Sequence, residues 1–217
     1  MTARIAIIPA RGGSKRIPRK NIRDFCGRPM IAHILHAARV SGLFDVIHVS
    51  TESEDIREVV EKLGFPIDFM RPVNLADDDT PIMPVMKYVV DAFAMKGQVF
   101  DQVWLLMACA PNISSNDLQQ AAASFDSADS GNSLVAVSEY PVPIEWAFTR
   151  SEDGKLTPVK SGMFALRSQD IEKKYYDTGS FAAFPAETVQ TSQGSGLDSV
   201  FDSYVLPKGS NVDIDDE

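Results

Sequence analysis

Five cationic side chains surround two glycines near the start of the chain, directly after a short apolar run at residues 5–8. Cations this close repel one another unless an anion lies between them, and the chain as a whole carries a net charge of −9. Glycine allows a backbone to approach a ligand closely, so that several N–H groups converge on an anion. We predict that this segment binds a polyphosphate; the alternative is a solvated basic turn. The glycines are Gly12 and Gly13, and the cations are Arg11, Lys15, Arg16, Arg19 and Lys20.

The spacing of this segment fits neither common phosphate-binding motif. A P-loop needs Gly-x-x-x-x-Gly-Lys-Ser/Thr and a dinucleotide site needs Gly-x-Gly-x-x-Gly, and neither pattern is present here. The segment resembles instead the signature of the sugar-acid cytidylyltransferases, which activate sialic acids and related nonulosonic acids as CMP-sugars. That signature runs Ala-Arg-x-x-Ser-Lys and continues into a Lys-Asn pair. The matching residues are Ala10-Arg11-Gly12-Gly13-Ser14-Lys15 and Lys20-Asn21.

The resemblance implies a reaction in which CTP and a nine-carbon sugar acid give a CMP-sugar and pyrophosphate. In such a transfer, positioning and electrostatic stabilisation of the phosphates carry most of the catalysis. We therefore expect Arg11, Lys15 and Lys20 to be catalytic. The expected nucleotide-binding residues of the same segment are Ala10, Gly12, Gly13, Ser14 and Asn21.

A second segment, at residues 71–80, resembles the family pattern Arg-Pro-x-x-Leu-Ala-Asp-x-x-Thr. In that family the arginine lies by the cytidine, so the resemblance adds Arg71, Asp79 and Thr80 to the nucleotide site. The aspartates at 77–79 have two interpretations from the residues alone. They could coordinate a metal, or they form a solvated turn before the next helix.

Asp213 and Asp215 are the candidate metal ligands. In an extended strand the two side chains lie on one face, where their oxygens suit a hard divalent cation. An acidic tail is more often simply solvated. The family has an Asp-Ile-Asp motif in the same position, and this resemblance implies Mg²⁺ as the cofactor.

The residues that would contact the sugar acid follow from resemblance alone. Sialic acid members end the relevant strand in Gln-Pro-Thr-Ser-Pro, whereas this chain has Met107 at the glutamine position and resembles the pseudaminic acid branch. Further on, residues 168–170 and 176–181 resemble the same branch. From the residues alone, a glycine turn after a helix is an equally good interpretation of 176–181. The implied substrate-binding residues are Met107, Arg167, Gln169, Asp177, Thr178 and Ser180.

The elements that position these residues alternate between strand and helix. This order predicts an α/β, Rossmann-like nucleotidyltransferase fold with a mainly parallel sheet, in which the basic segment lies at the carboxyl end of the first strand. We predict strands near residues 5–8, 45–51, 67–70, 103–107 and 133–139, and helices at 29–41, 53–63, 82–95 and 114–125.

The chain is predicted to be one domain, 1–217, with residues 141–174 as an inserted arm. Asp153-Gly154 between two short apolar pairs predicts a hairpin there. Trp and Phe side chains exposed on such an arm need cover, and a second copy of the chain supplies it. The resemblance also implies a homodimer formed through this insertion.

Composition excludes several functional classes. The acidic balance argues against a nucleic-acid partner, and no apolar run reaches the length of a membrane span, so we expect a cytoplasmic protein with no membrane partner. Cys26 and Cys109 have no metal-binding spacing, and the three histidines are expected to be structural.

The predicted function is a Mg²⁺-dependent cytidylyltransferase that uses pseudaminic acid. The alternatives are CMP-N-acetylneuraminic or CMP-legionaminic acid synthetases, whereas Lys15 argues against a Kdo enzyme, which has arginine there. A non-catalytic nucleotide-binding protein is the alternative from another class; it would bind CTP without releasing pyrophosphate.

Overall fold

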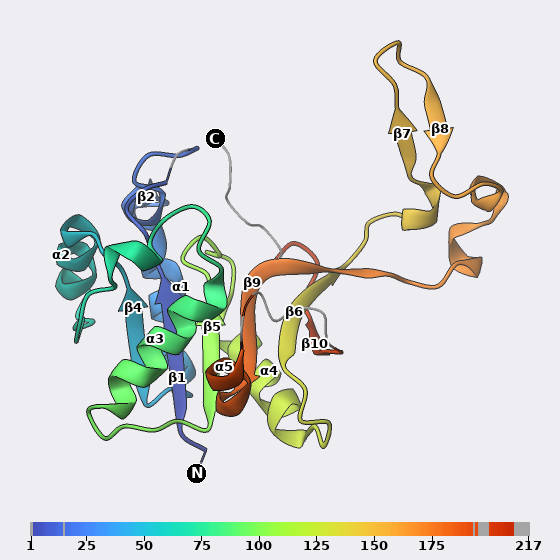
Figure 1. Ribbon diagram of the computed structural model, residues 1–217. Coiled ribbons are helices and arrows are strands. Elements are labelled where there is room, and N and C mark those ends of the chain that lie inside the picture. The colour runs from blue at the N-terminus through green and yellow to red at the C-terminus, as the bar shows by residue number, and fades with distance from the viewer. Residues whose placement is uncertain (1, 15, 193, 195–199, 211–217) are drawn as a thin grey trace.

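The computed structural model describes residues 2–14, 16–192, 194 and 200–210. Its centre is a six-stranded sheet in the order β10-β6-β9-β5-β1-β4 (Figure 1). β1 is parallel to β4 and β5, β10 is parallel to β6, and β9 runs antiparallel between β5 and β6. The expected mainly parallel α/β sheet is confirmed. The strands are β1 (Arg4–Pro9), β4 (Val46–Ser50), β5 (Gln102–Leu106), β6 (Leu134–Glu139), β9 (Tyr175–Pro185) and β10 (Asp202–Val205).

Helices cover both faces of the sheet because the central strands are apolar on both sides. In β1, Ala6 and Ile8 face one core, while Ile5 and Ile7 face the other. Helices α1, α2 and α4 pack in the first core, which also holds Trp104, and α3 and α5 pack in the second. The helices are α1 (Met30–Ser41), α2 (Glu54–Lys62), α3 (Ile82–Ala94), α4 (Ser115–Ser127) and α5 (Ala186–Thr191).

The strand order reverses beside β1. The chain runs from β1 through α1 to β4 on one side, and then through α2 and α3 to β5 on the other side of β1. In sheets of this kind ligands bind beyond the carboxyl ends of the strands at such a reversal. The segments that follow β1, β4 and β5 therefore meet at one edge.

Residues 141–174 leave the domain as the expected arm, which extends well away from the sheet in Figure 1. Its tip is the hairpin of β7 (Phe148–Arg150) and β8 (Leu156–Pro158), with Gly154 in the turn at a φ of 87°. The remaining short elements are the hairpin of β2 (Asp24–Phe25) and β3 (Arg28–Pro29), and the 3-10 turns η1 (Lys20–Ile22), η2 (Val73–Leu75), η3 (Ile144–Trp146), η4 (Met163–Ala165) and η5 (Ser168–Asp170).

One sequence-based expectation about an element is wrong, and one of the alternative interpretations does not hold. Residues 67–70 form no strand: Phe69 instead stacks on His48, with ring centroids 4.5 Å apart, so the segment buries its apolar side chains as a loop over the sheet. Residues 176–181 are not a turn after a helix. They lie within β9, where Gly179 has a φ of 62° beside a change of register against β6.

No helix in the described part of the chain is long and apolar enough to span a bilayer.

Candidate functional site

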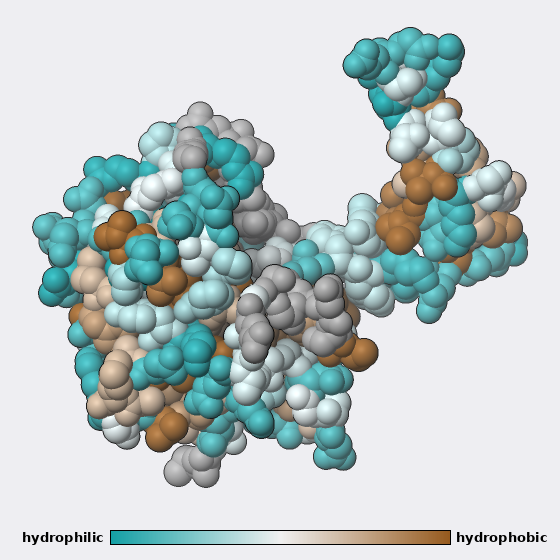
Figure 2. Space-filling model, in the orientation of Figure 1, coloured by the Kyte–Doolittle hydropathy of each residue, from teal (hydrophilic) through white to brown (hydrophobic). Residues whose placement is uncertain are grey.

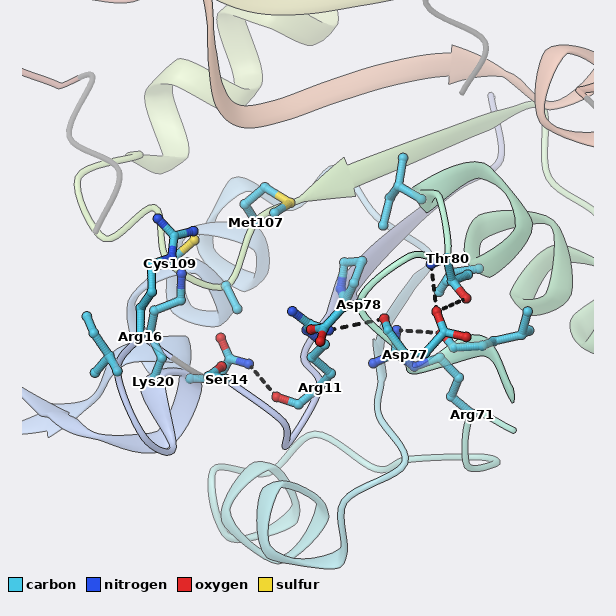
Figure 3. A pocket seen from close by; sticks show the side chains of 17 residues that line it. Arg11, Ser14, Arg16, Lys20, Arg71, Asp77, Asp78, Thr80, Met107 and Cys109 are labelled. Atoms are coloured by element: carbon cyan, nitrogen blue, oxygen red, sulfur yellow. Dashed lines mark hydrogen bonds and ion pairs between the residues drawn. The ribbon is translucent and has the colours of Figure 1, made fainter. Parts of the chain in front are cut away.

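A cavity of about 310 Å³ lies at the carboxyl edge of the sheet, at the reversal beside β1 (Figure 3). This volume is at the lower end of the usual range for small-molecule sites, roughly 300–1,000 Å³. Residues after β1, in the loop before α3 and after β5 form its walls. They are Pro9, Arg11, Ser14, Arg16, Ile17, Lys20, Asn21, Arg71, Leu75, Asp77, Asp78, Thr80, Ile82, Val85, Met107, Ala108 and Cys109.

The basic segment is a closed loop that supplies one side of this cavity. Asn21 is buried, and its side-chain amide donates to the carbonyl of Arg11 at 3.1 Å, which joins the two ends of the loop. Arg19 turns the chain with a left-handed φ of 56°, which costs a non-glycine residue roughly 1–2 kcal/mol. In Figure 3, Ser14, Arg16 and Lys20 lie together on one side of Arg11.

The glycine pair has a different role from the one expected. Neither Gly12 nor Gly13 is among the described residues with positive φ, so neither is needed for an unusual backbone conformation. A Cβ at Gly12 would lie 3.0 Å from the Cβ of Ser53, so this glycine is required by close packing against the segment after β4. Its N–H donates to Glu52 at 2.7 Å and is therefore already engaged within the protein.

Arg71 is the most buried cation of the cavity wall. Its guanidinium donates to Glu52 at 3.1 Å and to the carbonyl of Leu75 at 3.4 Å, and its side chain is 4 % exposed. Burial lowers the pKa of Arg71 below its ordinary value, and the Glu52 carboxylate opposes that shift. The ion pair therefore keeps a charged guanidinium at a site that water hardly reaches.

The three aspartates before α3 form a turn in which two carboxylates are already engaged. Asp77 accepts from the backbone N–H and the hydroxyl of Thr80, at 2.7 and 2.6 Å, and these bonds lower its pKa. Asp78 accepts from Arg11 at 2.5 Å. The structure thus supports the turn interpretation of 77–79 and places Arg11 against a carboxylate at the cavity (Figure 3).

Most of the nucleotide-site residues expected from sequence converge here. Ala10 is buried and does not line the cavity. Its neighbour Arg11 accepts the Asn21 amide through its carbonyl, and this bond holds the loop. The members of the expected site that line the cavity are Arg11, Ser14, Lys20, Asn21, Arg71, Thr80 and Met107.

Several expected residues do not line it. Asp79 is exposed and donates its backbone N–H to Asp77. Arg167 and Gln169 lie on the arm, where Arg167 pairs with Asp170 at 2.8 Å. Because the arm leads away from the sheet, these two residues lie apart from the cavity of their own chain, and their expected role toward the sugar acid stays a prediction.

The β9 candidates are also engaged in the strand itself. Thr178 is buried and donates to the carbonyl of Ala136 at 2.9 Å, and Asp177 accepts from the N–H of Gly179 at 2.8 Å. Ser180 is buried, and its hydroxyl has no partner among the described residues. Its carbonyl accepts from the N–H of Met107, so Ser180 lies next to the cavity wall without being part of it.

Lys15, Asp213 and Asp215 lie outside the described residues, so their expected roles stay predictions. Among the described residues no group of three or more His, Cys, Asp or Glu side chains is suited to hold a metal ion. Asp77 and Asp78 have the oxygen donors that Mg²⁺ prefers, but Thr80 and Arg11 already occupy them.

Sequence reasoning missed three participants. Arg16 and Asp78 line the cavity, and Glu52 holds both Gly12 and Arg71. Arg16 was visible in the basic cluster but has no counterpart in the family signature quoted above. Glu52 had one available signal, since it follows the strand at 45–51 and the carboxyl ends of parallel strands gather at one edge.

Comparison with known proteins agrees with this geometry. A family model described as cytidylyltransferase matches residues 5–133. The chain is 37% identical over 211 residues to a pseudaminic acid cytidylyltransferase of Campylobacter jejuni subsp. jejuni serotype O:23/36 (strain 81-176), covering 97% of this chain and 90% of the relative. It is 33% identical over 168 residues to a CMP-N,N'-diacetyllegionaminic acid synthase of Legionella pneumophila subsp. pneumophila (strain Philadelphia 1 / ATCC 33152 / DSM 7513), covering 77% and 69%.

Among solved structures, a CMP:2-keto-3-deoxy-manno-octonic acid synthetase complexed with CTP superposes with a TM-score of 0.68. The match covers 94% of this chain and 90% of the other at 16% identity, which makes it evidence for the shared fold alone.

Proposed function

This chain belongs to the cytidylyltransferase family, and from that premise we propose that it transfers CMP from CTP to a nonulosonic acid, with pseudaminic acid as the acceptor. The relative at 37% identity, which is named for this substrate and covered over 90% of its length, supports the choice of acceptor. The lower identity to the legionaminic acid synthase ranks that acid second.

The observation that carries the proposal is the meeting of three cations from one loop at a single cavity. Arg11, Arg16 and Lys20 all line it, together with the hydroxyl-bearing Ser14. In an acidic protein such a concentration of positive charge suits a polyanion, and a triphosphate is the polyanion that this family uses.

The proposed reaction forms one bond and breaks another at the α-phosphorus. The C2 hydroxyl oxygen of the sugar acid bonds to the α-phosphorus, the bond to the bridging oxygen of the β-phosphate breaks, and the hydroxyl proton passes to solvent. Negative charge grows on the leaving pyrophosphate, and we assign its neutralisation to Lys20 and Arg16, which line the cavity. Arg11 and Ser14 hold the triphosphate in line for the attack.

The opposite wall of the cavity suits the nucleoside. Apolar side chains from the loop before α3, from α3 and from the end of β5 offer a surface for the flat base, and Arg71 supplies donors beside it. The apolar residues of this wall are Leu75, Ile82, Val85 and Met107.

We propose Mg²⁺ as the cofactor, held by Asp213 and Asp215 as the family motif implies. When bound, the ion would neutralise phosphate oxygens and lower the pKa of the attacking hydroxyl. The engaged state of Asp77 and Asp78 supports ligands from elsewhere in the chain.

We further propose a homodimer formed through the arm, working in the cytoplasm where CTP is made. Figure 2 shows apolar surface on the arm. Trp146, Phe148 and Phe164 form a small aromatic cluster there with centroids 5.5–6.1 Å apart, and Phe164 is 66 % exposed. A second copy would cover this cluster, and Arg167 of one subunit would then be available to the acid carboxylate in the other.

The test is a turnover panel. The protein is incubated with CTP, Mg²⁺ and pseudaminic, legionaminic, N-acetylneuraminic or Kdo acid, and pyrophosphate release is measured while the CMP-sugar is identified by mass. We expect the highest kcat/KM with pseudaminic acid. CTP binding without pyrophosphate release from any acid would favour the non-catalytic alternative instead.

A further inference from the structure

A carboxylate outside the cavity wall connects the two nucleotide-binding segments. Glu52 lies just beyond the carboxyl end of β4 and is 17 % exposed at its side chain. One carboxylate oxygen accepts the N–H of Gly12 at 2.7 Å, and the other accepts the Arg71 guanidinium at 3.1 Å. We propose that Glu52 is a positioning residue: it holds the phosphate loop and Arg71 in the relative position that nucleotide binding requires.

The backbone around Glu52 makes it a fixed support. Ser50, two residues earlier, accepts the N–H of Ala10 at 2.9 Å, which extends the pairing of β1 and β4 up to the basic loop. Thr51 is buried and accepts the N–H of Arg71 at 2.8 Å. The backbone on either side of Glu52 is therefore held by the sheet and by the start of the Arg71 segment.

Glu52 transmits that position to the loop through Gly12. The N–H of Gly12 is bound to the carboxylate, and the carbonyl of Gly12 accepts the N–H of Ser14 at 3.1 Å. A Cβ at residue 12 would lie 3.0 Å from the Cβ of Ser53, so a side chain there would require Ser53 or the loop to shift. A shift of Gly12 would therefore move Ser14 and the cations that follow it.

Glu52 also holds the second segment. Arg71 is attached by its backbone to Thr51 and by its guanidinium to Glu52, and it lines the cavity, whereas Glu52 does not. Glu52 thus acts on a ligand only through Gly12 and Arg71. A purely structural role would lower stability alone, whereas a positioning role would weaken nucleotide binding as well.

The test measures by calorimetry how tightly the protein binds CTP in the presence of Mg²⁺. It rests on the proposed function only because CTP is taken as the ligand. Glu52→Ala is expected to weaken CTP binding about 10- to 100-fold. Gly12→Ala keeps the N–H that Glu52 accepts, but its Cβ would press on Ser53 and shift the loop while leaving the Arg71 ion pair in place, so it is expected to weaken CTP binding as well.

Asp126→Ala is the matched control. Asp126 pairs with Arg4 at 2.5 Å near the opposite end of β1, where the side chains are 42 % and 13 % exposed. Its replacement is expected to lower the thermal midpoint and leave CTP binding unchanged. Glu52→Gln, which keeps an oxygen for the Gly12 N–H, is expected to bind CTP more tightly than Glu52→Ala, and it keeps the test valid should the alanine variant not fold.

Wild-type affinity for CTP in folded Glu52→Ala would overturn the inference. Should that variant not fold, wild-type affinity in both Gly12→Ala and Glu52→Gln would overturn it. Absence of CTP binding by the wild-type protein would refute the proposed function instead, so the two failures are distinguishable. The KM for the sugar acid is expected to change less than the KM for CTP, because Glu52 contacts only the nucleotide-binding segments.

Discussion

The guanidinium of Arg11 donates to the carboxylate of Asp78 at 2.5 Å, across 67 residues of sequence and at the wall of the cavity. The same guanidinium donates to the carbonyl of Asp77 at 3.1 Å. The Arg11 and Asp78 side chains are 36 % and 40 % exposed, so solvent screens their attraction. An incoming triphosphate must therefore compete with Asp78 for Arg11.

Replacing Asp78 by Asn is expected to tighten CTP binding. An exposed ion pair contributes up to about 1 kcal/mol, so its removal should lower the Kd for CTP by roughly 2- to 5-fold. The gain should shrink at high salt, which screens the same charges. Calorimetry at two salt concentrations measures both effects.

Asp55→Asn is a suitable control for that change, because Asp55 pairs with Arg19 at 3.1 Å and neither side chain lines the cavity. Weaker CTP binding by Asp78→Asn would contradict the competition and would indicate that Asp78 contributes to holding a metal.

Replacing Lys20 by Ala is expected to lower kcat/KM by about 100- to 1,000-fold, the usual effect of removing one group that stabilises charge in the transition state. The thermal midpoint should remain near that of the wild type. Lys62→Ala, which removes an exposed lysine paired with Glu58 on α2, should leave both quantities unchanged. Lys15→Ala is expected to lower kcat/KM in the same way as Lys20→Ala. Wild-type turnover in both Lys15→Ala and Lys20→Ala would remove the loop from the mechanism.

The paired change Asp213→Ala/Asp215→Ala is expected to abolish the Mg²⁺ dependence of CTP binding. Calorimetric titration with CTP, with and without Mg²⁺, measures this without relying on turnover. Normal Mg²⁺ dependence in the paired variant would place the metal elsewhere, and Asp77→Asn and Asp78→Asn would be the next variants to titrate.

Stability is expected to fall at acid pH through His48. The ring is 1 % exposed and stacked on Phe69, and its nitrogens have no hydrogen-bond partner among the described residues. Burial lowers the pKa of His48 to about 4 from 6.5; Asp68 opposes this shift and Lys96 adds to it. The unfolded chain binds a proton between these values and the folded chain does not. The free energy of unfolding should therefore decrease as the pH falls from about 6.5 to 4, by about 3 kcal/mol in total.

Urea unfolding at pH 7 and at pH 4.5 measures this decrease. His48→Leu should flatten the pH dependence in that interval, because the leucine has no proton to bind. An unchanged slope in His48→Leu would assign the acid sensitivity to other groups.

The arm is expected to serve the neighbouring subunit. Arg167→Ala has an altered arm and an intact cavity, and Lys20→Ala has the reverse, so each homodimer should be nearly inactive. When the two are mixed and allowed to exchange subunits, a mixed dimer combines one intact cavity with one intact arm. Recovery of pyrophosphate release on mixing is the expected result, whereas an arm that serves its own cavity would give no recovery.

The sequence alone was sufficient to locate the four longer helices, four of the six sheet strands and the cationic loop, whereas β9 and β10 were not predicted. Helices 29–41, 53–63, 82–95 and 114–125 were predicted to within two residues at each end, since each has an apolar stripe at helical spacing and a clear end signal such as the Ser114 capping box. The hairpin around Gly154 was visible for a similar local reason. Local patterns of this kind do not depend on distant partners.

Tertiary structure decided which residues meet. Glu52 reaches Gly12 because β1 and β4 pair with Pro9 opposite Ser50, so the residues just beyond both strands come together. The segment at 67–70 has the composition of a strand, but packing of Phe69 against His48 takes it over the sheet as a loop. Arg167 has a plausible local motif, yet the direction of the arm removes it from its own cavity. Each of these outcomes depends on contacts between residues far apart in the chain, and no local pattern of residue types encodes such contacts.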